Sequence, residues 1–284
     1  MNAHLPLIAD IADPQLTQAL QHKLDHKTKP LGSLGRLEQL ALRLGQIQGT
    51  ASPRLEQPQM VVFAGDHGLA ARGVSAFPSD VTWQMVENFL AGGAAVSVLA
   101  RQHGLALTVV DCGVARDIAP REAAPGQPSL LLRKVAPGTN DASQGPAMST
   151  DQCAQALTNG MELVRDLPGN ALLLGEMGIG NTSVASLLLA RLCGVSLEDC
   201  TGAGTGLDAG GVARKRAVLA QALAANEGAV NPLDALAALG GFEVATLVGA
   251  VLQAASERRV ILVDGFITSA AVLVASRLQP HVLQ

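Results

Sequence analysis

The sequence predicts an α/β fold of three layers, in which helices cover both faces of a mostly parallel, doubly wound sheet. Four short and almost entirely apolar runs, at 60–64, 107–110, 171–174 and 260–263, are typical of parallel strands buried on both faces. Stretches with helical periodicity separate these runs, as crossover connections between parallel strands require. Nearly half of the 284 residues are apolar, and the many alanine, leucine, valine and glycine residues suit helices packed tightly against a sheet.

The first 50 residues predict a small helical domain that precedes an α/β domain at 51–284. Residues 1–28 have leucines four positions apart, which indicates a helix. A second helix begins after Ser33, a natural N-cap, and its apolar stripe runs to Ile47. Residues 50–59 contain two prolines and form the linker to the first strand.

Helices alternate with strands through the rest of the chain. The loop at 65–78 is long and rich in glycine, and loops of this kind inside a compact domain are usually binding loops or lids. Helices are expected at 79–90, after the Gly92-Gly93 pair up to Gln102, and at 151–165, 182–193, 209–226 and about 266–278. An irregular excursion is expected over 115–150. The apolar stretch 235–255 predicts a buried helix.

Composition and charge exclude several function classes. A formal charge of −4 argues against nucleic acid, which needs a basic face, and the lack of tyrosine argues against base-stacking platforms. The four cysteines have no C-x-x-C spacing, which predicts free thiols in a reducing cytosol and no metal site. No secretory signal opens the chain, and the stretch 235–255 carries Glu243, unlike most membrane spans. We expect a cytoplasmic protein without a membrane partner.

An acidic side chain stands at the end of each predicted strand. These residues are Asp66, Asp111, Glu176 and Asp264. Ligands of an open parallel sheet bind outside the carboxyl ends of its strands. The sequence therefore predicts a site at this edge, with carboxylates beside the ligand.

Two glycine-rich turns, at 175–183 and 201–208, each lead into a helix of this edge. Free N–H groups and the helix dipole favour an anion there, and glycine lets the backbone approach a phosphate. The candidate phosphate- and ribose-binding residues are Gly178, Gly180, Asn181, Thr182, Gly204, Thr205 and Lys215. Neither turn is a Walker A loop or a complete G-x-G-x-x-G motif. The residues thus point to a phosphorylated small molecule and leave the reaction open, with a ligand-free tight turn as the alternative.

Six motifs follow one another along nearly the whole chain. They are Thr28-Lys-Pro-Leu-Gly-Ser-Leu-Gly-Arg-Leu-Glu38, Phe63-Ala-Gly-Asp-His-Gly68, Asn88-Phe-Leu-Ala-Gly-Gly-Ala-Ala95, Gly175-Glu-Met-Gly-Ile-Gly-Asn-Thr182, Gly204-Thr-Gly-Leu-Asp208 and Val263-Asp-Gly-Phe-Ile267. In this order they closely resemble the nicotinate-nucleotide–dimethylbenzimidazole phosphoribosyltransferases. The resemblance implies a Rossmann-like sheet and a homodimer with apolar N-terminal helices at its contact.

The resemblance also implies a reaction of cobalamin biosynthesis. The phosphoribosyl group of nicotinate mononucleotide passes to 5,6-dimethylbenzimidazole, giving α-ribazole 5′-phosphate and nicotinate. The benzimidazole nitrogen attacks C1′ of the ribose, and the positively charged nicotinate ring is already a good leaving group, so no cofactor and no metal is implied. A carboxylate is needed to accept the proton of the benzimidazole.

The resemblance assigns roles to single residues. Glu176, which the resemblance places facing the substrates, is the strongest catalytic candidate that this sequence contains, with a carboxylate that only stabilises its turn as the alternative. Asp66 and His67 orient the base or form a structural pair, and Asp264 braces the loops at the sheet edge. The candidate base-binding residues are Phe77, Gln84 and Met85, which could instead belong to an apolar core.

The resemblance breaks at the C-terminal end. Family members continue into a Leu-Gly-Glu-Gly-Thr-Gly-Ala-type motif whose glutamate is the expected general base, and this sequence stops at Gln284 before any such motif. We expect a truncated form of a longer protein and not a natural variant with impaired catalysis. Two functions stay open: a transferase whose turnover is weak in this form, and a homologue that only binds the mononucleotide.

Overall fold

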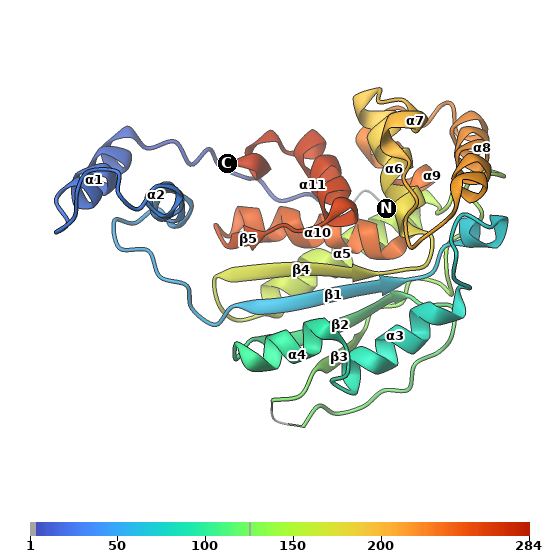
Figure 1. Ribbon diagram of the computed structural model, residues 1–284, viewed down its shortest axis with the longest axis horizontal. Coiled ribbons are helices and arrows are strands. Elements are labelled where there is room, and N and C mark those ends of the chain that lie inside the picture. Colours follow the sequence, from blue (N-terminus) through green and yellow to red (C-terminus); the bar gives the residue numbers. More distant parts are fainter. Residues whose placement is uncertain (1–3, 125) are drawn as a thin grey trace.

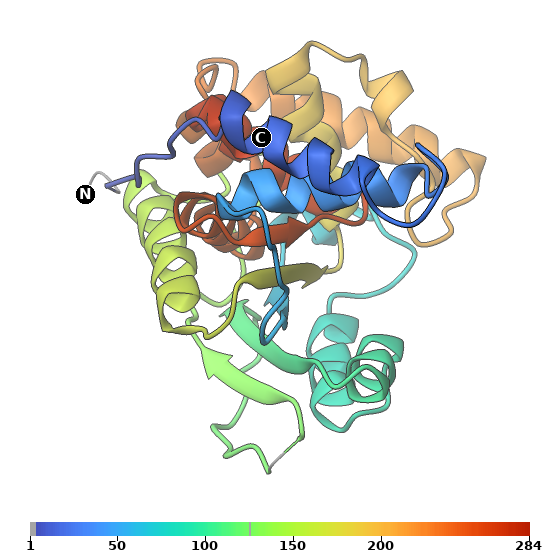
Figure 2. The same ribbon diagram turned by 90° about the vertical axis from the view of Figure 1, so that its left-hand side faces the viewer.

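The computed structural model describes residues 4–124 and 126–284 and contains a five-stranded sheet in which all strands are parallel (Figures 1 and 2). The strand order is β3-β2-β1-β4-β5. The strands are β1 Gln59–Gly65, β2 Ala106–Gly113, β3 Ser129–Leu132, β4 Ala171–Met177 and β5 Val260–Leu262. The chain winds outward from β1 in both directions, which confirms the α/β fold and places a topological switch point between β1 and β4.

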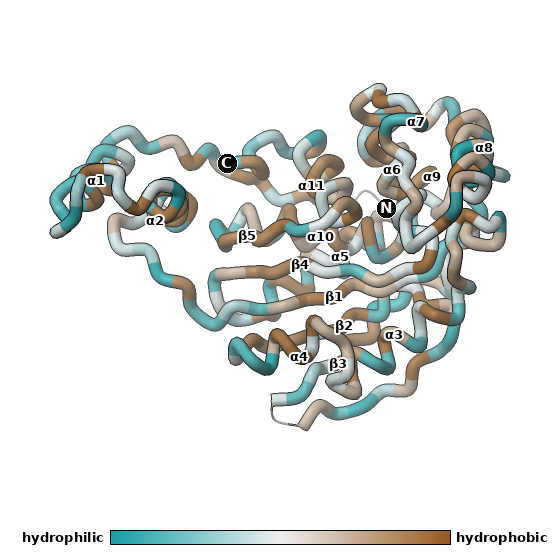
Figure 3. The backbone as a smooth tube through the Cα atoms, viewed as in Figure 1, coloured by the Kyte–Doolittle hydropathy of each residue, from teal (hydrophilic) through white to brown (hydrophobic). Residues whose placement is uncertain are grey.

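Helices cover both faces of the sheet (Figure 1). One face carries α3 (Asp80–Leu90) and α4 (Ala95–Gln102), and the other carries α5 (Thr150–Asp166), α10 (Phe242–Ser256) and α11 (Phe266–Leu278). Side chains of β1 alternate between the two cores, because Val61 and Phe63 pack on one side while Val62 and Ala64 pack on the other. Hydrophobic residues accordingly concentrate along the strands and α10 (Figure 3).

The apolar stretch 235–255, expected to be one helix, is two helices that meet at a glycine pair. α9 (Pro232–Leu239) ends at Gly240, and α10 begins after Gly241, its N-cap. The break brings the first turn of α10, including the fully buried Glu243, beside the end of β1. This turn becomes part of the site described below.

β3 lies inside the stretch 115–150 that was expected to be irregular. It is a four-residue edge strand whose partner is β2, with Thr108 paired to Ser129 and Asp111 paired to Leu132. An apolar run this short, next to proline and glycine, is too weak a pattern to be told from a loop.

The N-terminal helices α1 (Pro14–Asp25) and α2 (Arg36–Gln48) pack against each other, and α2 contacts the edge strand β5 (Figures 1 and 2). α1 starts later than expected, because Asp13 caps it by accepting a hydrogen bond from the Leu16 N–H and Pro14 occupies its first turn. Residues 4–13 are not helical, and residues 1–3 of the expected helix lie outside the described residues. The domain boundary at residue 50 stays a prediction.

Three further helices, α6 (Asn181–Cys193), the short α7 (Leu197–Cys200) and α8 (Ala209–Ala225), follow β4 in the chain. The 3₁₀ helices Gly68–Arg72 and Pro280–Leu283 complete the described elements. None of the helices in the described ranges is long and apolar enough to cross a membrane.

Candidate active site

The switch point brings several of the expected site residues together. Asp66 and His67 directly follow β1, and Glu176 lies near the end of β4, where its Cα pairs with that of Phe63. Asn181 begins α6 immediately after the β4 turn. The sheet therefore places these groups at its carboxyl edge, where open parallel sheets bind ligands.

Glu176 has the properties of a proton acceptor. The Asn181 amide Nδ2 donates a hydrogen bond to its Oε2 and fixes the carboxyl group. Burial raises the pKa of Glu176 to about 7, the nearby charge of Glu243 adds to the shift, and the Asn181 bond and His67 oppose it. A carboxyl group with a pKa near neutrality can take up a proton during a reaction and release it afterwards.

His67 and Glu243 form a buried ion pair next to Glu176. Nε2 of His67 lies 2.7 Å from Oε1 of Glu243, and the two side chains are 1% and 0% exposed. Burial alone would lower the pKa of His67, but the nearby acidic groups of Glu243, Asp66 and Glu176 together outweigh it and raise the pKa. Glu243 was not among the site residues predicted from the sequence. The glycine pair before it and its place in a first helical turn, where a carboxylate is favoured, were the available indications.

Asp66 is tied to the loop that follows β2. Its Oδ2 accepts a hydrogen bond of 2.8 Å from the Ala115 N–H, and burial raises the pKa of this carboxyl. Asp111 lies within β2 and accepts from the Val114 N–H at 2.9 Å, while its other oxygen lies 3.5 Å from Nζ of Lys134. Asp111 therefore stabilises a neighbouring loop at the same edge.

The expected phosphate-binding residues gather around the start of α6. Lys215, on α8, is almost fully buried, and its Nζ donates a hydrogen bond of 2.8 Å to Oγ1 of Thr182. Gly204 closes over this pair, since a Cβ atom there would lie 3.1 Å from Thr182 Oγ1 and 3.4 Å from Lys215 Nζ. Thr205 reaches across to Ser75, with 3.3 Å between their hydroxyl oxygens. Burial lowers the pKa of Lys215, which a bound anion would counteract.

The first turn of α6 has no side-chain cap. Its N-cap is Gly180, with φ +97°, and no side chain caps the helix. The hydroxyl of Ser183, in the same turn, is buried and has no hydrogen-bond partner within the described part of the chain. The helix dipole and the nearby lysine together favour an anion at this position, although the N–H groups of Asn181 and Ser183 already donate to the Gly178 and Gly180 carbonyls.

A largely apolar cavity of about 650 Å³ opens beside Glu176. It lies between α3, α4, β1, β4 and the start of α11, and Met85, Phe89, Glu176 and Asp264 are among its lining residues. Phe77 is 50% exposed and Gln84 is exposed, and neither lines this cavity. The cavity has the size and polarity to hold a flat aromatic base, with a carboxyl group at its wall.

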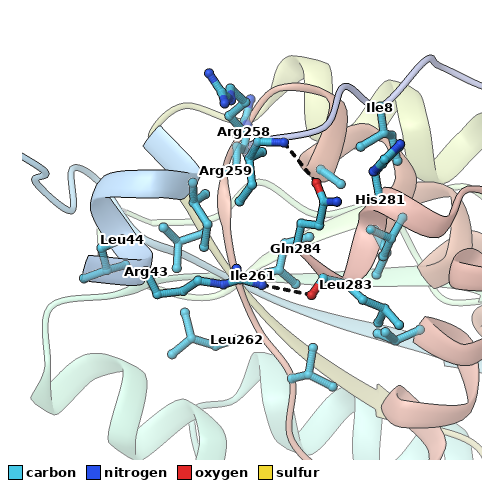
Figure 4. Close-up of a pocket in the computed structure, with 18 of the residues that line it drawn as sticks. Ile8, Arg43, Leu44, Arg258, Arg259, Ile261, Leu262, His281, Leu283 and Gln284 are labelled. Carbon is cyan, nitrogen blue, oxygen red and sulfur yellow. Dashed lines mark hydrogen bonds between the residues drawn. The ribbon is translucent and has the colours of Figure 1, made fainter. Parts of the chain in front are cut away.

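A second cavity, of about 390 Å³, lies away from these residues (Figure 4). α2, β5, α10 and the C-terminal residues surround it, and Arg43 donates a hydrogen bond of 2.9 Å to the Leu283 carbonyl at its rim. None of the expected site residues lines this cavity.

Comparisons with known proteins agree on one family. A profile of the family described as "Phosphoribosyltransferase" matches residues 9–284. A nicotinate-nucleotide–dimethylbenzimidazole phosphoribosyltransferase of Variovorax paradoxus is 70% identical over 283 residues, which cover 100% of this chain and 79% of the relative. A protein of the same name from Cupriavidus taiwanensis is 56% identical over 275 residues, covering 96% of this chain and 78% of the relative.

Solved structures give the same result. The crystal structure of CobT from Thermus thermophilus superposes with a TM-score of 0.89 at 40% identity, covering 95% of this chain and 80% of that one. A nicotinate-nucleotide–dimethylbenzimidazole phosphoribosyltransferase structure from the same organism gives a TM-score of 0.87 at 39% identity, over the same shares of the two chains.

Proposed function

Because the chain belongs to the phosphoribosyltransferase family, we propose that the residues at the carboxyl ends of β1 and β4 carry out its reaction. The enzyme transfers the phosphoribosyl group of nicotinate mononucleotide to dimethylbenzimidazole, the reaction for which its 70% identical relative is named. The products are α-ribazole 5′-phosphate and nicotinate, as cobalamin synthesis requires. The alternative of a homologue that only binds the mononucleotide is not favoured, since the match to these enzymes spans the chain.

The start of α6 is our proposed site for the 5′-phosphate. Support comes from the uncapped helix terminus, the buried Lys215 and the glycine turn at Gly204–Thr205 that closes over Thr182. Gly178 and Gly180 keep side chains out of the turn through which the phosphate would approach. A phosphate here compensates the buried lysine charge, and charge-assisted hydrogen bonds are the strongest that this turn can make.

The cavity beside Glu176 is our proposed site for the benzimidazole. Its apolar walls, including Met85, suit a planar aromatic ring, and the Glu176 carboxyl at its edge suits the ring N–H. Phe77 and Gln84 stay predicted base contacts. When the opposite ring nitrogen attacks C1′ of the ribose, Glu176 accepts the proton, and the remaining carboxylates favour the positive charge that develops at the ribose.

One observation carries this assignment: a carboxyl group with a pKa of about 7 lines the apolar cavity and accepts a hydrogen bond from Asn181 at the start of α6. Changing Glu176 to Gln keeps the shape of the side chain and removes its ability to accept a proton. We expect kcat to fall by about 10²–10⁴-fold, the usual contribution of a positioned base, with mononucleotide affinity nearly unchanged.

The assay is chromatographic detection of α-ribazole phosphate, with calorimetry for mononucleotide binding. Glu162→Gln, at an exposed position of α5, is the matched control and should behave like the natural chain. Full activity of Glu176→Gln would show that another group is the base, with Asp66 and Asp264 the next to be tested.

We further propose that the enzyme is a cytoplasmic homodimer. Support for association comes from the leucines at 31, 34, 37 and 40, each at least half exposed on or just before α2. Support for a reducing compartment comes from the four cysteines, which are all free thiols.

A further inference from the structure

Thr82 is a fully buried polar residue of α3 that the reaction outlined above does not use. It is 0% exposed, and its hydroxyl oxygen accepts a hydrogen bond of 3.1 Å from the backbone N–H of Ile179. Ile179 lies in the turn between β4 and α6, 97 positions further along the chain. One side chain of α3 therefore holds the turn that leads into the proposed phosphate site.

The turn needs an external partner because glycine stands on both sides of Ile179. Gly178 and Gly180 have no side chains that would restrict the orientation of the peptide groups, and Gly180 has a φ of +97°. The N–H of Ile179 and the carbonyl of Gly178 belong to one planar peptide group, so they point in opposite directions. While the N–H donates to Thr82, the Gly178 carbonyl accepts a hydrogen bond of 3.1 Å from the Asn181 N–H. The Thr82 hydroxyl thus fixes the peptide group that precedes α6.

The other side of this turn packs closely on the loop after β1. A Cβ atom at Gly178 would lie 2.5 Å from the Gly65 carbonyl oxygen and 3.0 Å from Nε2 of His67. One at Gly180 would lie 3.4 Å from Cβ of Ala70. This packing limits the space that the turn can occupy, whereas the hydrogen bond to α3 fixes the direction of its peptide group.

Thr82 also shares a face of α3 with the wall of the apolar cavity. Met85 and Phe89 line that cavity, and their spacing from Thr82 places all three residues on one side of the helix. The face that accepts the hydrogen bond from the turn thus continues into the proposed site for the benzimidazole. A change in how this helix meets the turn would alter the distance between the two proposed sites.

We propose that Thr82 is a positioning residue that holds the turn at Gly178–Gly180 against α3 and so places the 5′-phosphate relative to the base cavity. The inference rests on the phosphate site proposed above at the start of α6 and extends it to a residue of another helix. Thr82 acts through the backbone of Ile179 and not by contact with a substrate.

Thr82→Val tests the hydrogen bond, since it keeps the branched shape of the side chain and removes the acceptor. The first readout is hydrogen exchange of the Ile179 amide, followed by NMR with ¹⁵N-isoleucine and assigned by the resonance that is lost in Ile179→Val. We expect exchange at least about tenfold faster in Thr82→Val, because the buried N–H loses its partner. The Thr82 hydroxyl also lowers the pKa of Asp66, against the burial that raises it, and exchange at Ile179 reports on the turn and not on this carboxyl.

The second readout is calorimetry with nicotinate mononucleotide and with the riboside that lacks the phosphate. Thr82→Val should lower mononucleotide affinity by roughly 5–10-fold, which corresponds to one neutral hydrogen bond, and should change riboside affinity little. Thr82→Ser keeps the hydroxyl and should restore both slow exchange and mononucleotide affinity. The matched control is Thr158→Val, which removes a partly buried hydroxyl that donates to the Ala154 carbonyl within α5, and it should leave both readouts unchanged.

Unchanged exchange or unchanged mononucleotide affinity in folded Thr82→Val would overturn Thr82 as a positioning residue. If Thr82→Val does not fold, Thr82→Ala removes the hydroxyl without placing a methyl group against the N–H, and the same two results decide.

Lys215→Met tests the phosphate site separately. If this variant weakens both ligands equally, the phosphate lies elsewhere and the proposed site fails. If it weakens only the mononucleotide while Thr82→Val weakens neither ligand, the site stands and the role of Thr82 is overturned.

Discussion

At the scale of single residues, the site is built from ionisable groups in places where water is scarce. Glu176 illustrates the balance, because burial and Glu243 raise its pKa while Asn181 and His67 lower it. The net result is a carboxyl group that holds a proton well above its ordinary pKa of 4.5. Such a group is useful in proton transfer and unfavourable for the stability of the fold, since it must be deprotonated in a buried place at higher pH.

The free energy of unfolding should therefore depend on pH. The folded-state pKa of Glu176 is raised, so between its unfolded pKa near 4.5 and its folded pKa of about 7 the folded state binds more protons. The free energy of unfolding therefore falls through this window as pH rises. Glu176→Gln removes the effect and should be the more stable form at pH 8, by roughly 2–3 kcal/mol after allowance for partial solvent access, with the difference vanishing near pH 4.5.

Urea unfolding of both forms at several pH values measures this difference. Glu162→Gln, which alters an exposed carboxylate, provides the baseline. A difference between Glu176→Gln and the natural chain that stays constant with pH would contradict the raised pKa.

Lys215, at the proposed anion site, supports a second prediction. Lys215→Met keeps the apolar stem and removes the charge that we place against the 5′-phosphate. Affinity for nicotinate mononucleotide should fall by about 10–100-fold, as expected for loss of one charge-assisted hydrogen bond, while affinity for the riboside lacking phosphate should hardly change. Calorimetry with both ligands makes the comparison, with Lys27→Met as an exposed control. Equal losses for the two ligands would place the phosphate elsewhere.

At the scale of elements, the strands were predictable where they are buried on both faces, and less so elsewhere. Three of the apolar runs became β1, β2 and β4, and the fourth became the short β5. β3 escaped prediction because an edge strand of four residues has little apolar pattern to detect. The break between α9 and α10 at Gly240–Gly241 was not predicted, because in an almost uniformly apolar stretch the periodicity indicates no helix boundary.

The same distinction explains which site residues could be predicted. Asp66 directly follows β1 and Glu176 lies near the end of β4, so the general rule for parallel sheets places them at the carboxyl edge without any knowledge of side-chain contacts. Glu243 comes from a helix far along the chain and reaches the site only through tertiary packing. The lining of the cavity is likewise a property of how α3 and α4 lie on the sheet.

The crossing of α5 and α10 allows a prediction at this scale. A Cβ atom on Gly160 of α5 would lie 1.8 Å from the Thr246 carbonyl oxygen, and one on Gly249 of α10 would lie 2.0 Å from that of Leu157. Because backbone atoms cannot move aside, Gly160→Ala and Gly249→Ala should each destabilise the fold by about 1–3 kcal/mol or more, despite the better helix propensity of alanine. Thermal unfolding measures the loss. Gly228→Ala, where no atom lies within 4 Å of the added carbon, should be nearly neutral, and similar values for all three variants would contradict the close crossing.

At the scale of the whole molecule, the parallel topology determines where chemistry can occur. The chain leaves β1 toward β2 and β3 and returns to build β4 and β5 on the other side, so the loops after β1 and β4 separate at the switch point. Glu176 lines the apolar cavity and accepts a hydrogen bond from Asn181, where the proposed anion site at α6 begins. The proposed sites for the nucleotide and for the planar base therefore share one carboxyl group.

The surface of α2 and of the turn before it gives the prediction for the assembled molecule. Leu31, Leu34, Leu37 and Leu40 are 73%, 51%, 63% and 53% exposed, an apolar stripe of the kind that marks an interface. Burying leucines of this kind contributes about 1.5–3 kcal/mol per side chain, so several on each of two chains favour a stable dimer.

Light scattering after size exclusion should give a dimer mass at micromolar concentration, and Leu37→Glu should shift it toward monomer because a charge would then be buried at the contact. Lys27→Glu, which places the same charge on an exposed residue before the stripe, should leave the mass unchanged. A monomer mass for the natural chain at every concentration would contradict the dimer, and a dimer that tolerates Leu37→Glu would place the contact on another face.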